Sequence, residues 1–377
     1  MNILYITLDP LLSSSSASER NNLIIKGLVE LDYSIDIITI GQNPYETNQK
    51  IKVFSLNRSD KYVVISRHTI IKKLIRNIYY KFSLFDNTIS LKNAKVPSSF
   101  FNNHYDYIIS SSDPKTSHIL AKNIIEREHL SFSKWIQYWG DPLTGDISNK
   151  TIWPKKTIIS IERKIYNNCT SIVFVSPFTL ITQQNNHPKI VKRMQFVPVP
   201  HKYIKTFEHK ENNGNILKFG YFGSYYSNIR NILPTYEAFI NQKSNILKIA
   251  GNSNINLQSR VNIEILDNQP LSLLNKLEFE TDVYICILNK KGTQIPGKLY
   301  HYAGTTKPII VILDGDYKSE MRKYIESFNR FIVCDNTVED IVSVLSEKTL
   351  HQKYEPTKKL DKKVIAEMIL KSQSYRY

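Results

Sequence analysis

Lys298 stands in a polar stretch whose residue types suit the binding of an anionic ligand. Residues 293–304 read TQIPGKLYHYAG, and the apolar run Ile309–Leu313 follows shortly after. This order predicts a Pro-Gly turn, a short helix and a buried strand. The start of such a helix attracts an anion through its backbone N–H groups and its dipole, and a lysine adds a mobile positive charge. We therefore expect a diphosphate to bind at the start of this helix beside Lys298, within the segment Thr293, Gln294, Ile295, Pro296, Gly297 and Lys298.

Two aspartates come directly after strand-like runs, where a carboxylate can act on a bound ligand. Asp113 lies in YIISSSDP at residues 107–114, and Asp141 lies in QYWGDP at residues 137–142. A carboxylate within hydrogen-bond reach of a hydroxyl group can serve as a general base. Asp before Pro is also a frequent opening of a turn, so a structural role is the alternative for both residues.

The first half of the chain alternates strand-like and helical segments. We predict strands at residues 3–7, 35–40, 107–110, 135–138 and 171–175, and helices at 117–128 and 157–167. Another helix is expected after the loop 8–15, because Ser16–Glu19 fits a capping box. Alternation of this kind predicts a parallel sheet covered on both faces by helices.

A second alternating set follows residues 196–200 and the polar segment 208–215, which together are typical of an interdomain linker. Its expected strands are residues 217–221, 246–250, 261–266, 283–288, 309–313 and 330–333. The pattern predicts two tandem doubly wound α/β domains. Ligands of such sheets bind at the carboxyl ends of the strands, so we expect a site in a cleft between the two domains. Residues 360–372 are expected to form an amphipathic helix.

The composition restricts the partners of the chain. With 377 residues, of which 41% are hydrophobic, it can bury two cores. The 50 Lys and Arg residues against 34 Asp and Glu give a net charge of +16, which favours anionic partners. We expect no nucleic-acid partner, because the basic residues are scattered and no zinc-finger or RNP motif is present. Residues 67–82 are predicted to form a basic amphipathic helix that either lies on an anionic membrane or covers the sheet.

The expected compartment is the cytoplasm. No run approaches the length of a membrane-spanning helix, and residues 1–7 resemble a strand more than a secretion signal. Cys169, Cys286 and Cys334 show no metal-ligand spacing and fit small core residues in a reducing compartment. No metal site is expected.

The run from Pro296 to Ala303 resembles the donor-binding motif of bacterial GT-B glycosyltransferases of the family-four type, Pro-(Gly/Ser)-Lys-Leu-(Phe/Tyr)-Glu-Tyr-(Leu/Ala). Residues 219–233 look like the strand, glycine loop and basic residue that open the donor domain of that family. The resemblance implies that Arg230 and Lys298 hold the donor diphosphate and neutralise the charge that grows on it as it leaves. Gly223 and Ser224 would lie beside the same ligand. A surface ion pair for Arg230 and a solvated helix position for Lys298 are the alternatives.

Two positions depart from the family pattern. His301 stands where the family has a glutamate that binds ribose, and Thr293 stands where a glutamate contacts the donor sugar near the reacting carbon. An imidazole can still bond a ribose hydroxyl. Contact with a different nucleotide, or a packed helix histidine without a ligand, are the alternatives for His301. The nucleotide and the choice between retention and inversion are therefore left open.

In the first domain, Leu8–Ser18 resembles the glycine-rich loop that approaches the donor phosphate and the acceptor, with serines in place of glycines. The resemblance implies binding through Ser14, Ser15 and Ser16, and Arg20 matches a basic residue often found there. A serine loop without a ligand and a surface charge are the alternatives. Relatives carry an aspartate at the place of Asp141, which makes it the preferred base ahead of Asp113. His118 is a candidate sugar contact or a helix-face histidine.

We interpret the chain as a metal-independent GT-B glycosyltransferase, with two Rossmann-like α/β domains facing a central cleft. It would move a sugar from a nucleotide-sugar donor to a hydroxyl of a lipid-linked or growing surface glycan, such as capsule, O-antigen or lipopolysaccharide, at the inner face of the cytoplasmic membrane. Residues 1–199 are assigned to the acceptor domain, 200–359 to the donor domain and 360–377 to a helix that crosses back. No cofactor is expected beyond the nucleotide-sugar substrate. A nucleotide-sugar epimerase and a non-catalytic GT-B scaffold are the alternatives.

Overall fold

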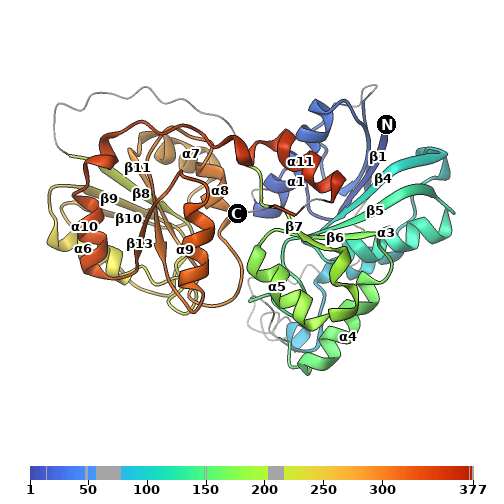
Figure 1. Cartoon of the computed structure of the whole chain (residues 1–377), viewed down its shortest axis with the longest axis horizontal. Coiled ribbons are helices and arrows are strands. Elements are labelled where there is room, and N and C mark those ends of the chain that lie inside the picture. The colour runs from blue at the N-terminus through green and yellow to red at the C-terminus, as the bar shows by residue number, and fades with distance from the viewer. Residues whose placement is uncertain are drawn as a thin grey trace. The chain divides into compact units, whose positions relative to one another are not determined.

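The computed structural model describes residues 1–13, 15–46, 50–56, 78–147, 149, 151–202, 216–372 and 374–375. Ser14, most of the basic segment 67–82 and the polar segment 208–215 lie outside these residues. The chain divides into two compact units, residues 1–199 with 362–376, and residues 200–361. Each unit is built on one parallel sheet, as Figure 1 shows. The predicted fold class of two Rossmann-like α/β units is confirmed.

The first unit contains a seven-stranded sheet in the order β3-β2-β1-β4-β5-β6-β7. Its strands are β1 (Asn2–Thr7), β2 (Ser34–Ile40), β3 (Ile51–Leu56), β4 (His104–Ser111), β5 (Ser131–Trp139), β6 (Ser171–Phe174) and β7 (Met194–Phe196). Its helices include α1 (Ser16–Glu30), α3 (Thr116–Arg127), α4 (Lys155–Tyr166), α5 (Pro177–Asn186) and α11 (Lys362–Lys371). Short 3₁₀ helices lie at Asn87–Asn93, Ser98–Phe100 and Pro188–Arg193.

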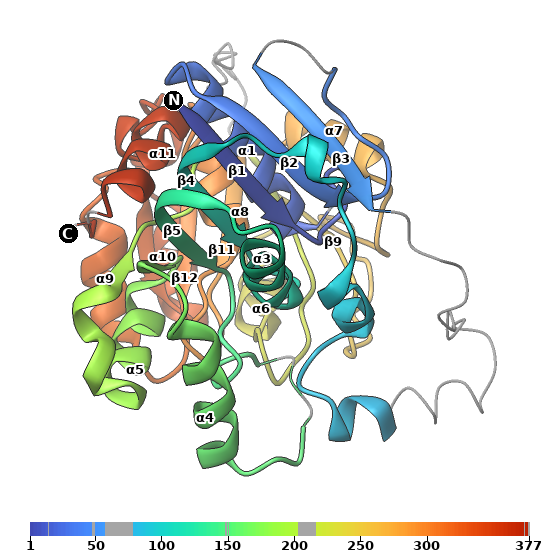
Figure 2. The same ribbon diagram turned by 90° about the vertical axis from the view of Figure 1, so that its right-hand side faces the viewer.

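Successive residues of β1 point to opposite faces of this sheet, and both faces are covered. Leu4 and Ile6 belong to a core that includes side chains of α3 and α4. Tyr5 points the other way, and its hydroxyl donates a hydrogen bond to Asn21 of α1. Helix α11 packs on α1, as Figures 1 and 2 both show, so the end of the chain belongs to the first unit.

The second unit contains a six-stranded sheet in the order β10-β9-β8-β11-β12-β13. The strands are β8 (Lys218–Phe222), β9 (Ile246–Ala250), β10 (Ile263–Leu266), β11 (Val283–Ile287), β12 (Ile309–Leu313) and β13 (Ile332–Asp335). The helices include α6 (Leu233–Asn241), α7 (Leu271–Glu280), α8 (Gly297–Tyr302), α9 (Lys318–Glu326) and α10 (Val338–Leu345). Short 3₁₀ helices lie at Lys348–His351 and Lys358–Leu360. Side chains of α6 and α10 share the larger core with the sheet, and Leu277 of α7 packs in a smaller one with Phe222 and Ala250.

Several local predictions need correction. Ser15 caps α1 by accepting a hydrogen bond from the Ser18 N–H at 2.9 Å, so the expected capping box at Ser16–Glu19 is one residue out of register. Phe196, assigned to the linker, is the last residue of β7. The sequence patterns also did not predict β3, which has a partly exposed middle at the sheet edge.

The three cysteines lie in the core, as the sequence predicted. Cys169, Cys286 and Cys334 are buried and form no disulfide. Within the described part of the chain, no helix is both long and apolar enough to cross a lipid bilayer.

Candidate functional site

Three loops of the first unit follow the carboxyl ends of three adjacent strands. The loop after β1 carries Asp9, the loop after β4 carries Asp113, and the loop after β5 carries Asp141. Because these strands are parallel, their carboxyl ends meet at one edge of the sheet. The strand order reverses between β1 and β4, and doubly wound sheets bind their ligands beside such a reversal.

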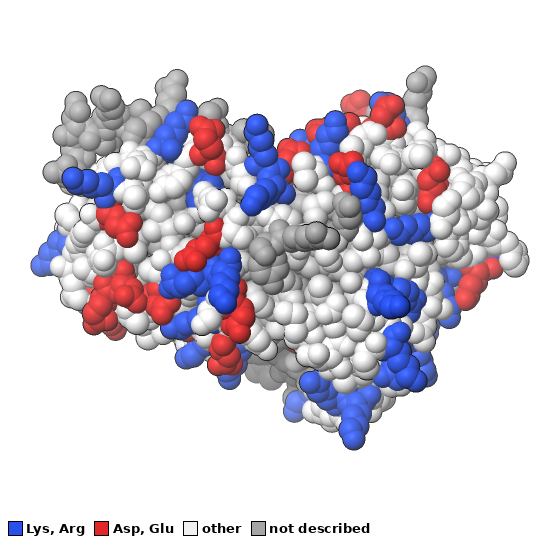
Figure 3. All heavy atoms as spheres, in the orientation of Figure 1, with Lys and Arg blue, Asp and Glu red and all other residues white. Residues whose placement is uncertain are grey.

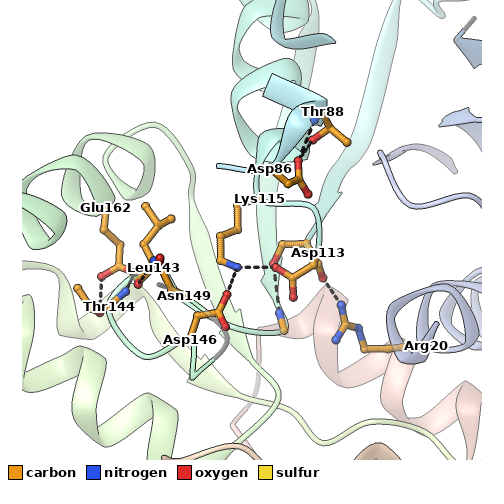
Figure 4. Close-up of polar contacts among 12 residues, drawn as sticks. Arg20, Asp86, Thr88, Asp113, Lys115, Leu143, Thr144, Asp146, Asn149 and Glu162 are labelled. Atoms are coloured by element: carbon orange, nitrogen blue, oxygen red, sulfur yellow. Dashed lines mark hydrogen bonds and ion pairs between the residues drawn. The ribbon is translucent and has the colours of Figure 1, made fainter. Parts of the chain in front are cut away.

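Arg20 extends from α1 to this edge and is only 6% exposed. Its Nη2 donates a hydrogen bond to the carbonyl oxygen of Ser112, and its guanidinium lies 5.2 Å from the centre of the Tyr138 ring. Figure 4 shows the side chain reaching from α1 toward the loop that holds Asp113. A Cβ on Gly140 would come within 2.7 Å of its Nη1. Arg20 is therefore a buried cation and not a surface charge.

Lys115 joins two carboxylates from different loops (Figure 4). Its Nζ donates to Oδ1 of Asp113 and to Oδ2 of Asp146, both at 2.8 Å. Burial by itself would lower the pKa of Lys115, but the two aspartates outweigh it and raise this pKa above its usual value. The lysine therefore stays charged, and its two ion pairs connect the loop after β4 with the loop after β5.

The pKa of the Asp141 carboxyl group lies well above the usual value of an aspartate. Burial raises its pKa to about 7, and the neighbouring negative charges of Asp113 and Asp146 act in the same direction. Lys115 and Arg20 offset part of this effect. A carboxyl group with a pKa near 7 is present in both protonation states at neutral pH, which is the condition for efficient general base catalysis.

Buried polar side chains fasten the loop of Asp141 to α4 and α5. Thr144 in this loop donates its backbone N–H at 3.2 Å and its hydroxyl at 2.9 Å to the carboxylate of Glu162. His187 Nε2 lies 3.0 Å from the same carboxylate, and both side chains are fully buried. Neither Glu162 nor His187 lies in a sequence motif, so neither was predicted as part of the site. Figure 4 shows Thr144 bonded to Glu162 of α4, with Asp146 between this pair and Asp113.

The serine loop contributes one defined contact. The Ser15 hydroxyl donates to Oδ2 of Asp9 at 2.5 Å, while it also caps α1. Burial raises the pKa of Asp9, and the bond from Ser15 opposes this rise. Ser16 is exposed at the start of α1, and Ser14 lies outside the described residues. The structure thus brings Ser15 to the cluster and gives Ser16 no contact with it.

His118 lies in the core and not at a ligand-accessible surface. The ring is 0% exposed, stacks on Trp139 at 4.1 Å and lies 2.9 Å from the Ser110 hydroxyl through Nδ1. Burial lowers the pKa of His118 well below its usual value, so the ring is neutral. A fully buried ring does not reach a sugar, so the structure does not agree with the sugar contact expected of His118.

In the second unit, Arg230 links the loops that follow the adjacent strands β8 and β11. Its Nε donates to Oδ1 of Asn289 at 2.9 Å, and its Nη1 donates to the carbonyl oxygen of Ser224 at 3.3 Å. Asn289 in turn donates to the carbonyl oxygen of Gln294 at 3.2 Å. The strand order reverses between β8 and β11, so Arg230 lies where this sheet would bind a ligand. Asn289 was not predicted, although it directly follows a buried apolar run.

The packing of the chain does not require a glycine at position 223. A Cβ there would meet its nearest atom, the Tyr221 hydroxyl, at 3.6 Å, which is an ordinary contact. Gly251 is the position where glycine is needed, because a Cβ there would lie 2.1 Å from the Gly223 carbonyl oxygen. The protein therefore leaves room beside Gly223.

Lys298 is paired with a carboxylate that the sequence analysis did not anticipate. Its Nζ lies 2.5 Å from Oε1 of Glu278 in α7, and 3.4 Å from the Tyr302 hydroxyl. Tyr302 also donates to Glu278 at 3.0 Å and stacks on Tyr284 at 4.0 Å. An ammonium group has three N–H donors, so these two contacts leave one donor for a ligand.

The thiol of Cys286 is affected by the charges of both Lys298 and Arg230. Burial raises the pKa of this thiol to about 12, and the positive charges of Lys298 and Arg230 both oppose the rise. The positive charges of both residues thus act on one thiol of β11.

The remaining residues of the predicted donor segment surround the start of α8. This helix has six residues and begins after Pro296 without a side-chain cap. Thr293 and His301 are each 8% exposed, whereas the other positions are partly exposed: Gln294, Ile295, Pro296, Gly297 and Lys298. Across the described residues of both units, no three His, Cys, Asp or Glu side chains are placed to hold one metal ion.

No protein-family model and no curated protein sequence matches this chain. Its fold, however, is similar to solved structures over almost its full length. HepE of Anabaena, in complex with UDP and glucose, aligns with 98% of this chain and 97% of its own at a TM-score of 0.55 and 10% identity. The catalytic domain of starch synthase IV from Arabidopsis thaliana, bound to ADP and acarbose, aligns with 100% of this chain and 95% of its own chain. The TM-score is 0.56 and the sequence identity is 10%.

A glycosyltransferase of Rickettsia africae aligns with 99% of this chain and 94% of its own at a TM-score of 0.52 and 13% identity. At such low identities the similarity concerns the fold alone. Together with the two sheet orders, it identifies the fold class as GT-B.

Proposed function

We propose that the protein is a glycosyltransferase that moves a sugar from a nucleoside diphosphate sugar to a hydroxyl group of an acceptor glycan. The observation that carries the proposal is the position of Asp141 in the loop after β5, at the carboxyl edge of the first sheet, where burial raises its pKa. The first unit would serve the acceptor through Asp141. The second unit would serve the donor through Arg230 and Lys298.

In the proposed reaction, Asp141 accepts the proton of the acceptor hydroxyl while the hydroxyl oxygen forms a bond to the anomeric carbon. The bond between that carbon and the phosphate oxygen breaks, and the nucleoside diphosphate leaves with the electron pair. Fixed positive charge at Arg230 and Lys298 would stabilise the growing negative charge, with no metal ion in the proposal. Direct displacement of this kind inverts the configuration at the anomeric carbon.

UDP is the first donor nucleotide to test, because HepE and the S. aureus protein MnaA were both solved with UDP. The acceptor is proposed to be a lipid-linked or growing glycan of a bacterial surface polysaccharide. This part of the proposal rests on the family resemblance of residues 293–304.

The experiment that tests the function is a thermal-shift screen against nucleotides and nucleotide sugars, followed by a release assay. Release of free nucleoside diphosphate on addition of a glycan acceptor supports transfer. Conversion of the nucleotide sugar without such release supports the epimerase alternative. Absence of nucleotide binding by calorimetry supports the scaffold alternative.

Glu278 is expected to compete with the donor phosphate for Lys298. Glu278→Gln keeps an acceptor for Lys298 and Tyr302 but removes the negative charge, so UDP should bind several-fold more tightly in calorimetry. The affinity for uridine, which has no phosphate, should not change. Glu280→Gln is the matched control, because it removes the same charge two residues away, where Glu280 faces Lys248 and Lys276. Weaker UDP binding by Glu278→Gln would show instead that the carboxylate positions Lys298.

His301 tests the expected ribose contact. A neutral imidazole offers one acceptor and one donor, whereas a carboxylate accepts from both ribose hydroxyls. His301→Glu should therefore keep or strengthen UDP binding, and His301→Ala should weaken it. Calorimetry with UDP distinguishes the two results. Loss of binding in His301→Glu together with normal binding in His301→Ala would make His301 a packing residue.

A further inference from the structure

Two segments of the first unit that are far apart in the sequence form one exposed apolar surface. Residues 78–82 are helical, and the segment 151–153 lies against their end. The Ile152 N–H donates to the Lys81 carbonyl at 3.0 Å, and the Trp153 Nε1 donates to the Phe82 carbonyl at 2.9 Å. These two hydrogen bonds hold the two segments together.

The apolar side chains of this surface are large and exposed. Phe82 and Ile152 are each 60% exposed, and Trp153 is 42% exposed. The indole N–H of Trp153 is already bonded to the Phe82 carbonyl. The exposed part of the tryptophan is therefore mainly its apolar ring, which loses no hydrogen bond when it leaves water.

Basic side chains continue this surface along α4. Lys155, Lys156, Arg163 and Lys164 are exposed, and the acid of this helix, Glu162, is fully buried against His187. Figure 3 shows Lys and Arg side chains gathered over α4, at the lower right, with no Asp or Glu among them on the face shown. We call the set Phe82, Ile152, Trp153, Lys155 and Lys156 the basic aromatic surface.

We propose that the basic aromatic surface binds an anionic lipid bilayer. Tryptophan and phenylalanine fit the boundary between headgroups and acyl chains, and the neighbouring lysines attract anionic headgroups. A protein partner fits this surface less well, because lysine is depleted from protein–protein interfaces. The inference does not depend on sugar transfer, and its test needs no activity.

The test measures sedimentation of the full chain with vesicles of phosphatidylcholine alone and of phosphatidylcholine with phosphatidylglycerol. We expect binding to the anionic vesicles only, and weaker binding as salt is added. Lys155→Gln with Lys156→Gln should weaken binding about fivefold for each charge removed. The control Lys348→Gln with Lys353→Gln removes two exposed lysines from the second unit and should change binding little.

Tryptophan fluorescence reports on the same surface. The chain has three tryptophans, and Trp135 and Trp139 are 2% and 0% exposed, so a change in emission on vesicle binding reports Trp153. We expect a blue shift and protection from acrylamide with anionic vesicles, and both should be lost in Trp153→Phe. Three results would each overturn the proposal. The two double lysine variants could bind anionic vesicles equally well, the wild-type protein could bind neutral vesicles as well as anionic ones, or the emission of Trp153 could stay unchanged in vesicle-bound protein.

Discussion

Replacing Asp141 by Asn should lower kcat about a thousandfold, within the range typical of a lost general base. The substitution keeps the size of the side chain but removes its ability to accept a proton. In the wild-type protein, the transfer rate should rise with pH through about 7, because Asp141 acts as a base only when it is deprotonated. This dependence should be absent from the residual rate of Asp141→Asn, measured by release of nucleoside diphosphate.

Stability measurements separate lost chemistry from lost folding in Asp141→Asn. The folded-state pKa of Asp141 is raised from 3.8 to about 7, so protonated Asp141 favours the fold and ionised Asp141 opposes it. This favourable contribution is complete below pH 3.8 and is lost as pH rises to about 7. Asparagine never ionises, so the variant should have a Tm at least as high as that of the wild type at pH 8. A lower Tm there would contradict the environment assigned to Asp141.

Asp113→Asn distinguishes the two candidate bases. The negative charge of Asp113 contributes to the raised pKa of Asp141. Its removal should shift the rise of rate with pH to lower pH while most of the maximal rate remains. If Asp113→Asn lost activity as Asp141→Asn is expected to, Asp113 would be the base.

The second large effect is expected from the two cations of the donor unit. Lys298→Ala and Arg230→Ala should each cost about 2–3 kcal/mol of transition-state stabilisation, because each removes a charged hydrogen bond to the leaving diphosphate. This corresponds to roughly 30- to 150-fold in kcat/KM. Steady-state kinetics at limiting donor concentration measure the effect. Near-normal turnover in both variants would refute the assignment of the donor site.

Because Lys298 is paired with Glu278, the Lys298→Ala experiment needs a control for the unpaired carboxylate. Lys298→Ala by itself leaves the 11% exposed carboxylate of Glu278 without its cation, which would reduce stability as well as activity. Lys298→Ala combined with Glu278→Gln restores the charge balance. The double variant should regain stability in thermal unfolding but not turnover. Recovery of turnover would mean that Lys298 acts through the local structure and not on the donor.

The sequence determined the fold class because the information needed is local. Apolar runs of about five residues alternate with helical patterns, and the runs at 246–250 and 309–313 match β9 and β12 residue for residue. Boundaries moved where a tertiary contact intervened. Strand β13 begins at Ile332 and not at residue 330, where the buried Arg330 donates to the carbonyl oxygens of Thr305 and Lys307.

The sequence also pointed to Lys298 at the start of a helix and to Asp141 after a strand-like run, whereas Arg230 and the preference for Asp141 over Asp113 came from the family resemblance. Only the tertiary structure decided which groups surround them. Glu278 reaches Lys298 from 20 residues away, and Asp146 reaches Lys115 from 31 residues away. The raised pKa of Asp141 likewise depends on burial and on charges from other loops. These residues become neighbours because parallel strands bring their carboxyl ends together. Local hydrophobic periodicity in the sequence does not show which loops will meet there.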